Sequence, residues 1–444
     1  MSYSSKDGFY DVVIIGGGIL GVTISYWLAQ LYDCSVALIE KETEVAKHAS
    51  TRNTGLLHRP FYLNPEKKRV FSRAAQKSYF LWKDLATKYN LAWSPIGTLE
   101  VALDDQQVQT VNQYKEWAIK NGVEEDEVEV LDSKQVQKLE PQVRCAGAIF
   151  SKTDTSVNYG EFTNFVFEMA RKNAVKFLGG SQVQEIKETG ENVGIRLRDI
   201  DGRRKEISAK FLINAAGGGS VDIAHELGLA KEYTDLHFRG EYWIVDEPFA
   251  STITRNIYSV ARYKEFPFLD PHFVIRTNGI RQIGPNATLV SGPGAYKGLS
   301  ETRFQLVSKI FERPIGPKLK LFTNGMFLSL IWHEWRSSIS KKAMSDRVKA
   351  FIPSIDVSYL NERGLAGVRS SLIDKNGFVP EAILISGKQS MHILNYNSPG
   401  ATGAPAFSAY VISKIMQEGS FERLKKKPIS SEDQLWKFDD ASDL

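Results

Sequence analysis

Apolar residues follow two patterns in the first forty residues of the chain. Residues 10–16, Tyr-Asp-Val-Val-Ile-Ile-Gly, are a short apolar run that ends in glycine, as is typical of a buried parallel strand. Residues 19–31 then carry apolar side chains at helical spacing, and residues 35–40 form a second short apolar run. Strand, helix and strand in such a short stretch predict a βαβ unit.

The rest of the chain mixes helical and extended patterns. Apolar residues at helical spacing predict helices within 66–90, 105–120, 161–174, 300–350 and 399–418. Alternating or short apolar runs predict strands within 182–213, 236–292, 382–385 and 392–394. Asp201-Gly202 is the expected hairpin turn of the first of these stretches. The charged tail 421–444 is expected to be loosely ordered.

A glycine motif lies where the first predicted strand meets the first predicted helix. Gly16, Gly18 and Gly21 form the pattern GxGxxG, and Glu40 follows at the end of the second strand. Gly16 permits a tight turn, Gly18 lets the backbone approach a pyrophosphate, and Gly21 lets helix and strand pack closely. The helix N-terminus then faces the phosphates, and a carboxylate at Glu40 suits a ribose diol. The motif predicts a dinucleotide site.

Three further stretches extend this picture beyond one βαβ unit. Residues 52–58 have the small and polar character of a loop passing beneath a flavin, and residues 212–217 form another strand that ends in glycine. A glycine-rich loop at 397–403 opens the last helix, whose N-terminal dipole can stabilise negative charge on a flavin. Since a nicotinamide enzyme would normally need only the first loop, this arrangement favours FAD.

Composition narrows the class of protein. The 444 residues suggest two domains, and the net charge of +4 with no basic stripe argues against a nucleic-acid partner. Cys34 and Cys145 have no partner at CxxC or metal-ligand spacing, so we expect neither a disulfide framework nor a metal site. The N-terminus lacks the apolar core of a signal peptide, and no apolar run reaches the ~18 residues of a membrane span. We therefore expect a cytoplasmic protein.

Several stretches resemble one family of flavoproteins, in family order along the chain. They are 39–42, 53–58, 238–242, 267–273, 283–287, 367–369 and 397–402. On these residues the chain resembles the D-amino-acid-oxidase-type (glutathione-reductase-2) FAD-dependent oxidoreductases, and within them most closely the L-2-hydroxyglutarate dehydrogenases and oxidases.

The resemblance implies an α/β fold with two domains. A discontinuous, Rossmann-like FAD-binding domain is expected over 8–95, 141–235 and 350–420. A second, α+β substrate domain with a mainly antiparallel sheet is expected over 96–140 and 236–349. The expected cofactor-binding residues are Gly16, Gly18, Gly21, Glu40, Lys41, Asn53, Thr54, Gly55, Ala216, Gly217, Gly400, Ala401 and Thr402.

The resemblance also implies oxidation of a small 2-hydroxy acid, L-2-hydroxyglutarate in particular, by hydride transfer to flavin N5. Such a reaction needs a cation for the carboxylate and a base for the hydroxyl proton. Arg369 is the expected carboxylate clamp, and either His58 or His272 is the expected base. Substrate contacts are expected at Arg239, Tyr242 and Arg59.

Two departures from the family pattern affect the substrate more than the fold. Arg59-Pro60-Phe61-Tyr62 replaces a stretch that usually starts with small residues, and Asn-Ser-Pro-Gly-Ala at 397–401 replaces Pro-Ser-Pro-Ala-Ala. An amino acid or amine, glycerol 3-phosphate and malate therefore stay open as substrates. A flavin-binding subunit or scaffold without turnover of its own is the non-enzymatic alternative.

One segment bears on the electron acceptor. Residues 326–335 are apolar and aromatic, and Lys318, Lys320, Lys341 and Lys342 flank them. This composition suits either a core helix or shallow docking on the inner face of a membrane, where a quinone could accept electrons. A homo-oligomer is also compatible with the sequence.

Overall fold

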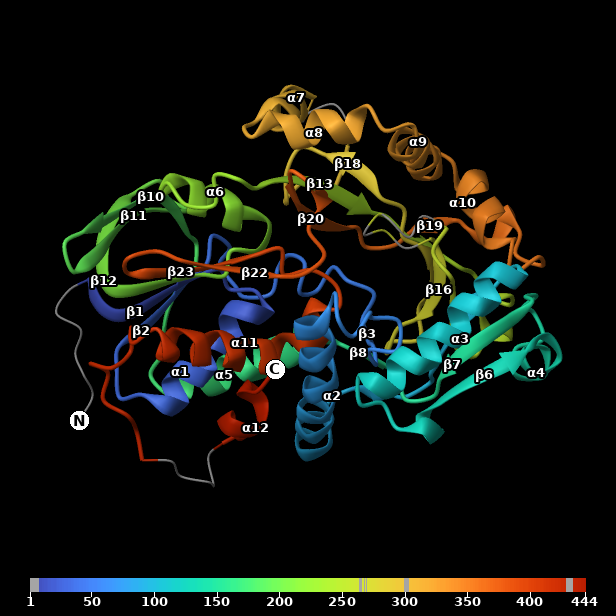
Figure 1. The fold of residues 1–444 in the computed structure, drawn as a ribbon, viewed down its shortest axis with the longest axis horizontal. Helices are drawn as coiled ribbons and strands as arrows, with labels where there is room; N and C mark the ends of the chain where they lie inside the picture. Colours follow the sequence, from blue (N-terminus) through green and yellow to red (C-terminus); the bar gives the residue numbers. More distant parts are fainter. Residues whose placement is uncertain (1–7, 263–265, 267, 269, 299–302, 429–433) are drawn as a thin grey trace.

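The protein divides into a larger α/β region and a region of antiparallel sheets with outer helices, which lie side by side in Figure 1. The computed structural model describes residues 8–262, 266, 268, 270–298, 303–428 and 434–444. The three chain segments predicted to build a discontinuous domain do meet in the α/β region, because β1, β12 and β23 share one sheet.

The central sheet of the α/β region has the order β10-β11-β12-β1-β2-β9, with β23 beside β12 and β22 beside β23. Its strands are β1 (Phe9–Ile15), β2 (Val36–Ile39), β9 (Lys176–Leu178), β10 (Ser181–Thr189), β11 (Asn192–Asp199), β12 (Arg204–Asn214), β22 (Ile383–Ser386) and β23 (Ser390–Leu394). β1 pairs in parallel with β2 and β12, in the register Val12↔Val36 and Val12↔Phe211. Their apolar runs are buried on both faces, as parallel strands require.

Helices cover one face of this sheet and form the largest apolar core. They are α1 (Ile19–Leu31), α2 (Arg69–Tyr89), α5 (Tyr159–Lys172), α11 (Gly400–Gln417) and α12 (Phe438–Ser442). α1 is buried from Ile19 to Ala29 because α5 and α11 both pack against it. The short helix α6 (Ser220–Glu226) follows β12 and contacts β10, β12 and β23.

The second region contains an eight-stranded sheet of order β19-β14-β17-β16-β15-β5-β7-β6, antiparallel except for the β15–β5 pair. Its strands are β5 (Thr98–Ala102), β6 (Val128–Asp132), β7 (Gly147–Ser151), β14 (Trp243–Ile244), β15 (Asn256–Ser259), β16 (His272–Ile275), β17 (Arg281–Gly284) and β19 (Glu362–Arg363). The helices α3 (Asp105–Lys120) and α4 (Ser133–Leu139) pack on it.

Two smaller sheets join the regions. One has the order β18-β13-β20-β21 and consists of β13 (Thr234–Gly240), β18 (Thr288–Val290), β20 (Gly367–Asp374) and β21 (Gly377–Phe378). The other has the order β3-β8-β4 and consists of β3 (Leu56–Leu57), β4 (Trp93–Ser94) and β8 (Thr155–Val157).

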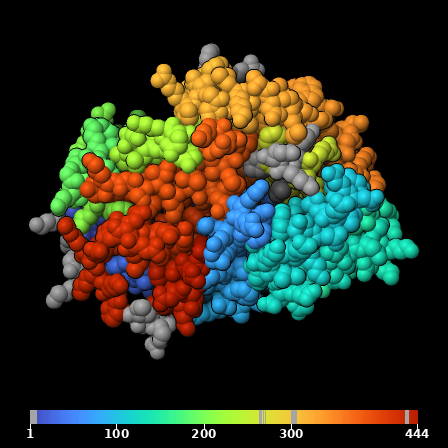
Figure 2. Space-filling view, viewed as in Figure 1, coloured from blue at the N-terminus to red at the C-terminus, as the bar shows by residue number. Residues whose placement is uncertain are grey.

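Four helices form the outer ridge of the second region, drawn in orange in Figures 1 and 2. They are α7 (Arg303–Phe311), α8 (Ile315–Phe322), α9 (Gly325–Ile339) and α10 (Lys341–Val348). Among the described residues, no helix combines the length and the apolar character needed to cross a membrane.

The predicted α/β fold class and βαβ unit are confirmed, as is the turn at Asp201-Gly202 between β11 and β12. The helical pattern predicted within 300–350 forms four separate helices, and residues 299–302 lie outside the described part. The domain boundaries stay a prediction. β7 pairs in the eight-stranded sheet of the second region, and β20 pairs in one of the smaller sheets that join the regions, although both fall in segments expected to belong to the FAD-binding domain.

The expectation of a loosely ordered tail was wrong for its described residues. Phe421 and Trp436 are buried, and the Trp436 indole N–H donates to the carbonyl of Leu81 at 2.9 Å. The Trp436 ring packs against Trp27 and Trp82 in the core beneath α1 and α2. Charge dominates the tail's composition, but two aromatic side chains are enough to anchor it.

Candidate active site

The first glycine loop has the close contacts that its sequence motif predicts. Gly16 has a φ of 108°, and a Cβ on it would lie 2.4 Å from the carbonyl oxygen of Ala215. A Cβ on Gly21 would lie 1.9 Å from the carbonyl oxygen of Gly16. Side chains are therefore excluded at both positions by backbone atoms, and the N-terminus of α1 can pack directly beneath the loop.

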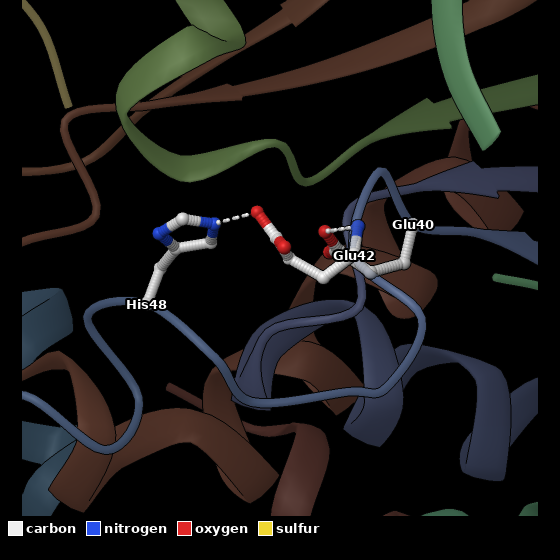
Figure 3. Close-up of side chains that lie close together, drawn as sticks. All are labelled: Glu40, Glu42 and His48. Atoms are coloured by element: carbon white, nitrogen blue, oxygen red, sulfur yellow. Dashed lines mark hydrogen bonds and ion pairs between the residues drawn. The ribbon is translucent and has the colours of Figure 1, made fainter. Parts of the chain in front are cut away.

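Glu40 lies against this loop at the end of β2 (Figure 3). Its carboxylate accepts the N–H of Gly17 at 2.7 Å and the N–H of Glu42 at 2.9 Å. The Glu42 carboxylate contacts His48 Nε2 at 2.9 Å, and His48 Nδ1 contacts the Tyr296 hydroxyl at 2.6 Å. These acidic and imidazole groups are spaced closely enough for a metal ion, but each already has a partner within the protein.

A cavity of about 670 Å³ begins at this loop and ends between the two regions. Of the expected cofactor residues, those that line it are Gly16, Gly18, Glu40, Lys41, Asn53, Thr54, Ala216, Gly217, Gly400, Ala401 and Thr402. Gly21 and Gly55 do not line it. Gly21 supports the loop from beneath, and Gly55, at a φ of 71°, donates its N–H to Asn53 Oδ1 at 2.8 Å.

The helix α11 points its N-terminus into the same cavity. Its first residues Gly400–Thr402 line the wall, and neither a capping side chain nor an acidic residue occupies its first turn. The Thr402 hydroxyl bonds the Tyr159 hydroxyl at 2.8 Å, which fixes this turn. The helix therefore presents its positive end to whatever fills the cavity.

The far end of the cavity brings together residues from both regions. His58, Tyr242, Tyr258, His272 and Arg369 all line it. They come from β15, β16 and β20, from the loop after β3 and from the link between β13 and β14, across more than three hundred positions of sequence. The Tyr258 and His272 rings stack with centroids 3.9 Å apart, and the His58 ring meets Tyr258 edge-on at 5.4 Å.

The two predicted histidines differ in their surroundings. His272 is fully buried, and its Nδ1 lies 3.2 Å from the carbonyl of Asp270, so Nδ1 carries the proton. Its Nε2 has no hydrogen-bond partner among the described residues. Burial, with smaller contributions from nearby His58 and Arg369, lowers the pKa of His272 to about 3. His58 Nδ1, in contrast, lies 2.9 Å from a carboxylate oxygen of Asp154.

Burial also shifts the pKa of other groups at this end of the cavity. It raises the pKa of Tyr242 to about 12, against the effect of Arg276 and Arg369, so the phenol stays neutral. It lowers the pKa of Arg369 from its ordinary value, with Tyr62 and Tyr242 acting in the opposite direction. A guanidinium starts from so high a value that it keeps its charge.

Arg59 and Arg239 do not line the cavity, contrary to the substrate contacts expected of them. Arg59 is fully buried behind it, where it pairs with Glu127 at 2.8 Å and lies over the Tyr79 ring. Arg239 pairs with Glu241 at 3.4 Å and donates to the carbonyl of Gly298 at 3.0 Å. In both cases a nearby carboxylate within the protein already neutralises the guanidinium.

In the motif 267–273, Pro267 and Leu269 lie outside the described residues.

Sequence reasoning missed Asp154, Tyr258 and Glu100. Asp154 is fully buried in the turn between β7 and β8, and Glu100 on β5 is buried nearby. Burial, together with the negative charge of Asp154, raises the pKa of Glu100 to about 8. None of the three belongs to a motif, and only the pairing of distant strands brings them to the site. A polar residue inside an apolar strand, as at Glu100, was the one available signal.

With this geometry in view, comparison with known proteins is decisive. The profile of a family described as FAD dependent oxidoreductase (DAO) matches residues 11–414. The chain belongs to this family. It is 30% identical to a mitochondrial L-2-hydroxyglutarate dehydrogenase of Caenorhabditis elegans, over 92% of this chain and 93% of that protein. It is 31% identical to an L-2-hydroxyglutarate dehydrogenase of Indibacter alkaliphilus, over 89% of this chain and 96% of that protein.

A solved structure gives the same fold. The FAD-bound L-alpha-glycerophosphate oxidase of Mycoplasma pneumoniae superposes with a TM-score of 0.71 at 20% identity, over 95% of this chain and 97% of that one. The cavity of the present chain also suits FAD. It has a glycine loop that excludes side chains, a carboxylate at the end of β2, and an uncapped helix N-terminus at the other end.

Proposed function

We propose that the protein oxidises the 2-hydroxyl group of L-2-hydroxyglutarate, or of a close 2-hydroxy acid, to the 2-oxo acid. The named activity of the relatives supports this substrate class. The observation that carries the proposal is that one arginine and two histidines meet at the end of the cavity whose other end suits a dinucleotide. FAD, when bound, supplies the acceptor for the hydride that leaves C2.

In this proposal the three glycine loops hold FAD. The first loop, with Gly16 and Gly18, would receive the pyrophosphate at the N-terminus of α1. The carboxylate of Glu40 would accept from the ribose hydroxyls while it keeps its bond to Gly17. The N-terminus of α11 would stabilise negative charge at the pyrimidine side of the flavin.

Arg369 is proposed as the clamp for the substrate carboxylate. It lines the cavity from β20, close to Tyr62 and Tyr242. A guanidinium in such surroundings binds a carboxylate through two parallel hydrogen bonds. Tyr242, neutral and lining the same wall, would donate a further hydrogen bond.

His58, rather than His272, is proposed as the base. With a pKa of about 3, the His272 ring would bind a proton far too weakly to remove one from an alcohol. Its unpartnered Nε2 is better suited to accept a hydrogen bond that orients the substrate. His58 is the histidine whose ring contacts a carboxylate, with its Nδ1 2.9 Å from Asp154. In the reaction, the O–H proton would pass to His58 while the C2 hydride leaves and C2–O becomes a carbonyl.

An anaerobic titration followed by flavin absorbance tests the proposed function. We expect L-2-hydroxyglutarate to bleach the flavin and D-2-hydroxyglutarate, the matched mirror-image control, to leave it oxidised. Faster bleaching by an amino acid, glycerol 3-phosphate or malate would identify that compound as the better substrate and contradict the proposed one. No bleaching by any of them, in protein that dithionite reduces normally, would favour a flavin-binding subunit without turnover.

We further propose that the outer ridge docks on an anionic membrane surface, where a quinone could accept the electrons. Its helices expose large apolar side chains at Val307, Phe311, Leu319, Met326, Leu328, Trp332 and Ile339. Exposed apolar patches of this kind mark interaction sites. Residues 303–349 also carry ten Lys and Arg against three Asp and Glu, which suits anionic lipid.

Co-sedimentation with vesicles containing phosphatidylserine tests this docking. Binding at low salt should be lost in Trp332→Ser and kept in Ile200→Ser, since Ile200 is an even more exposed apolar side chain on the other region. Absence of binding by the unmodified protein, or equal loss in both variants, would contradict membrane docking. A self-association that disappears in Trp332→Ser would instead identify the ridge as a contact between copies of this chain.

A further inference from the structure

Asp154 is the most tightly fixed charged group beside the proposed base. It is fully buried in the turn between β7 and β8. One carboxylate oxygen, Oδ2, lies 2.9 Å from His58 Nδ1. The other, Oδ1, accepts the N–H of Arg59 at 2.8 Å and the hydroxyl of Ser151 at 2.7 Å. These donors hold the carboxylate in one orientation, with one oxygen directed at the imidazole.

We propose that Asp154 is a positioning residue that fixes the tautomer and ring orientation of His58 and stabilises the imidazolium formed during oxidation. The inference rests on the proposed function, which makes His58 the base. A carboxylate can only accept a hydrogen bond, so the proton of a neutral His58 ring must reside on Nδ1. The lone pair is then on Nε2, the nitrogen directed away from Asp154, and His58 lines the cavity.

Proton transfer to His58 makes its contact with Asp154 stronger than it is in the resting protein. When the substrate O–H bond breaks and an Nε2–H bond forms, the His58 ring becomes a cation. It then lies 2.9 Å from an anion with no water between them. An interaction that strengthens as charge develops lowers the barrier, whereas one of constant strength does not.

The other groups around His58 do not replace this anion. The titratable side chains next to it are Tyr62 in the loop after β3, Tyr258 on β15 and His272 on β16. Slightly farther out, Glu100 on β5 acts on Asp154, and Arg369 on β20 acts on His272. Glu100, with a pKa of about 8, is mostly protonated at pH 7. His272 is neutral, and the pKa of Tyr62 is raised by burial. Asp154 is therefore the anion in direct contact with the ring.

A purely structural role is the alternative, in which the pair only ties the loop after β3 to the turn before β8. Asp154→Asn separates the two, because the amide keeps the shape and part of the hydrogen bonding but removes the charge. An amide can also donate to Nδ1, which would move the ring proton to Nε2. Loss of positioning should thus appear in the tautomer and in the rate, while stability and FAD occupancy change little.

The first measurement is the ¹⁵N–¹H NMR spectrum of the histidine rings in the FAD-loaded protein without substrate, with His58→Asn used to assign the signals. We expect the His58 proton on Nδ1 in the unmodified protein and loss of that signal in Asp154→Asn. Glu140→Gln is the matched control, because Glu140 is an equally buried carboxylate that bonds Thr254 and does not line the cavity. It should leave the His58 signal in place.

The second measurement is the anaerobic rate of flavin reduction. Asp154→Asn should slow it by on the order of 10²- to 10⁴-fold, with a change in substrate affinity of no more than about threefold. Glu100→Gln in the same background removes any compensation by ionisation of Glu100 and should not restore the rate. Asp154→Glu should recover part of it. An unchanged rate and tautomer in Asp154→Asn would overturn the proposal.

The NMR measurement also covers two further outcomes. If Asp154→Asn fails to fold or to bind FAD, a ring proton on Nε2 of His58 in the unmodified protein would overturn the proposal without any variant. If no 2-hydroxy acid reduces the flavin, the proposed function fails while the tautomer assignment can still stand. The two failures are therefore distinguishable.

Discussion

The two ends of the cavity are built in opposite ways. The dinucleotide end comes from one continuous stretch, in which Gly16, Gly21 and Glu40 lie within a single βαβ unit. The substrate end brings together His58 from the loop after β3, His272 from β16 and Arg369 from β20. A continuous stretch leaves a readable motif because backbone geometry dictates its spacing. Separate elements leave only single residues whose neighbours are set by strand pairing.

The two ends also differ in what their polar groups do. At the dinucleotide end backbone N–H groups and a helix terminus supply the donors, and Glu40 already bonds Gly17. At the substrate end buried side chains dominate, and burial lowers the pKa of His272 to about 3 and raises that of Glu100 to about 8 and that of Tyr242 to about 12. We therefore expect mutations at the first end to change cofactor occupancy and those at the second to change rates.

The largest effect is expected for Gly21→Ala. The added Cβ would lie 1.9 Å from the carbonyl oxygen of Gly16, and neither backbone can move without separating α1 from β1. We expect loss of bound FAD and a fall of about 3 kcal/mol in the free energy of unfolding. The ratio of flavin to protein absorbance after gel filtration measures occupancy. Gly316→Ala is the control, since a Cβ there meets nothing within 4 Å. Full FAD occupancy in Gly21→Ala would show that FAD binding does not require glycine at this position of the motif.

The second effect ranks the two histidines. His58→Asn should slow flavin reduction by on the order of 10²- to 10⁴-fold, because it removes the base. His272→Asn should slow it by only about tenfold, the size of one lost hydrogen bond to the substrate. Stopped-flow absorbance under anaerobic conditions gives both rates, with FAD occupancy checked first. A larger effect in His272→Asn would reverse the assignment of the base.

Arg369→Lys tests the clamp. Lysine keeps the charge but cannot form two parallel hydrogen bonds to a carboxylate, so we expect a loss of about 2 kcal/mol in substrate binding, roughly thirtyfold in Kd. Titration of the oxidised protein with the 2-oxo acid product measures the change without turnover. Arg239→Lys is the matched control on the neighbouring strand, because Arg239 pairs with Glu241 outside the cavity. Equal weakening in both variants would remove Arg369 from its proposed role.

The sequence predicted the elements and the first glycine loop well. At the substrate end His58, Tyr242, His272 and Arg369 line the cavity as expected, whereas Arg59 and Arg239 do not, and Asp154 was missed. Glycines forced by backbone contacts, such as Gly16, and apolar runs such as β1 carry their reason in the local pattern. Arg59 was judged by its position after His58, yet its side chain turns away from the cavity toward Glu127. Asp154 could not be found at all, since its meeting with His58 depends on the pairing of β3 with β8.

A smaller effect is expected for Glu40→Ala at the dinucleotide end. The variant loses the proposed bonds to the ribose and the support of the Gly17 N–H, but the glycine loop and the helix terminus remain. We expect FAD to bind about tenfold more weakly, equivalent to about 1.4 kcal/mol. Glu42→Ala removes the neighbouring carboxylate, which contacts His48 instead, and should bind FAD normally. Fluorescence quenching during reconstitution with FAD gives both dissociation constants; equal values would contradict a role for Glu40 in binding.

The smallest expected effect is a change in the pH dependence of stability, caused by Glu100 near the substrate end. The pKa of Glu100 is about 8 in the folded protein against an ordinary value of 4.5, so between these values the folded state binds the extra proton. Stability contributed through Glu100 is therefore lost as pH rises through this window. Between pH 6 and pH 7, Glu100→Gln should gain about 1 kcal/mol relative to the unmodified protein. Urea unfolding at the two pH values measures this difference. Glu129→Gln, which removes a half-exposed carboxylate on β6 of the same sheet, should show none. If both variants respond alike, the substrate end does not hold a carboxyl group that burial keeps protonated.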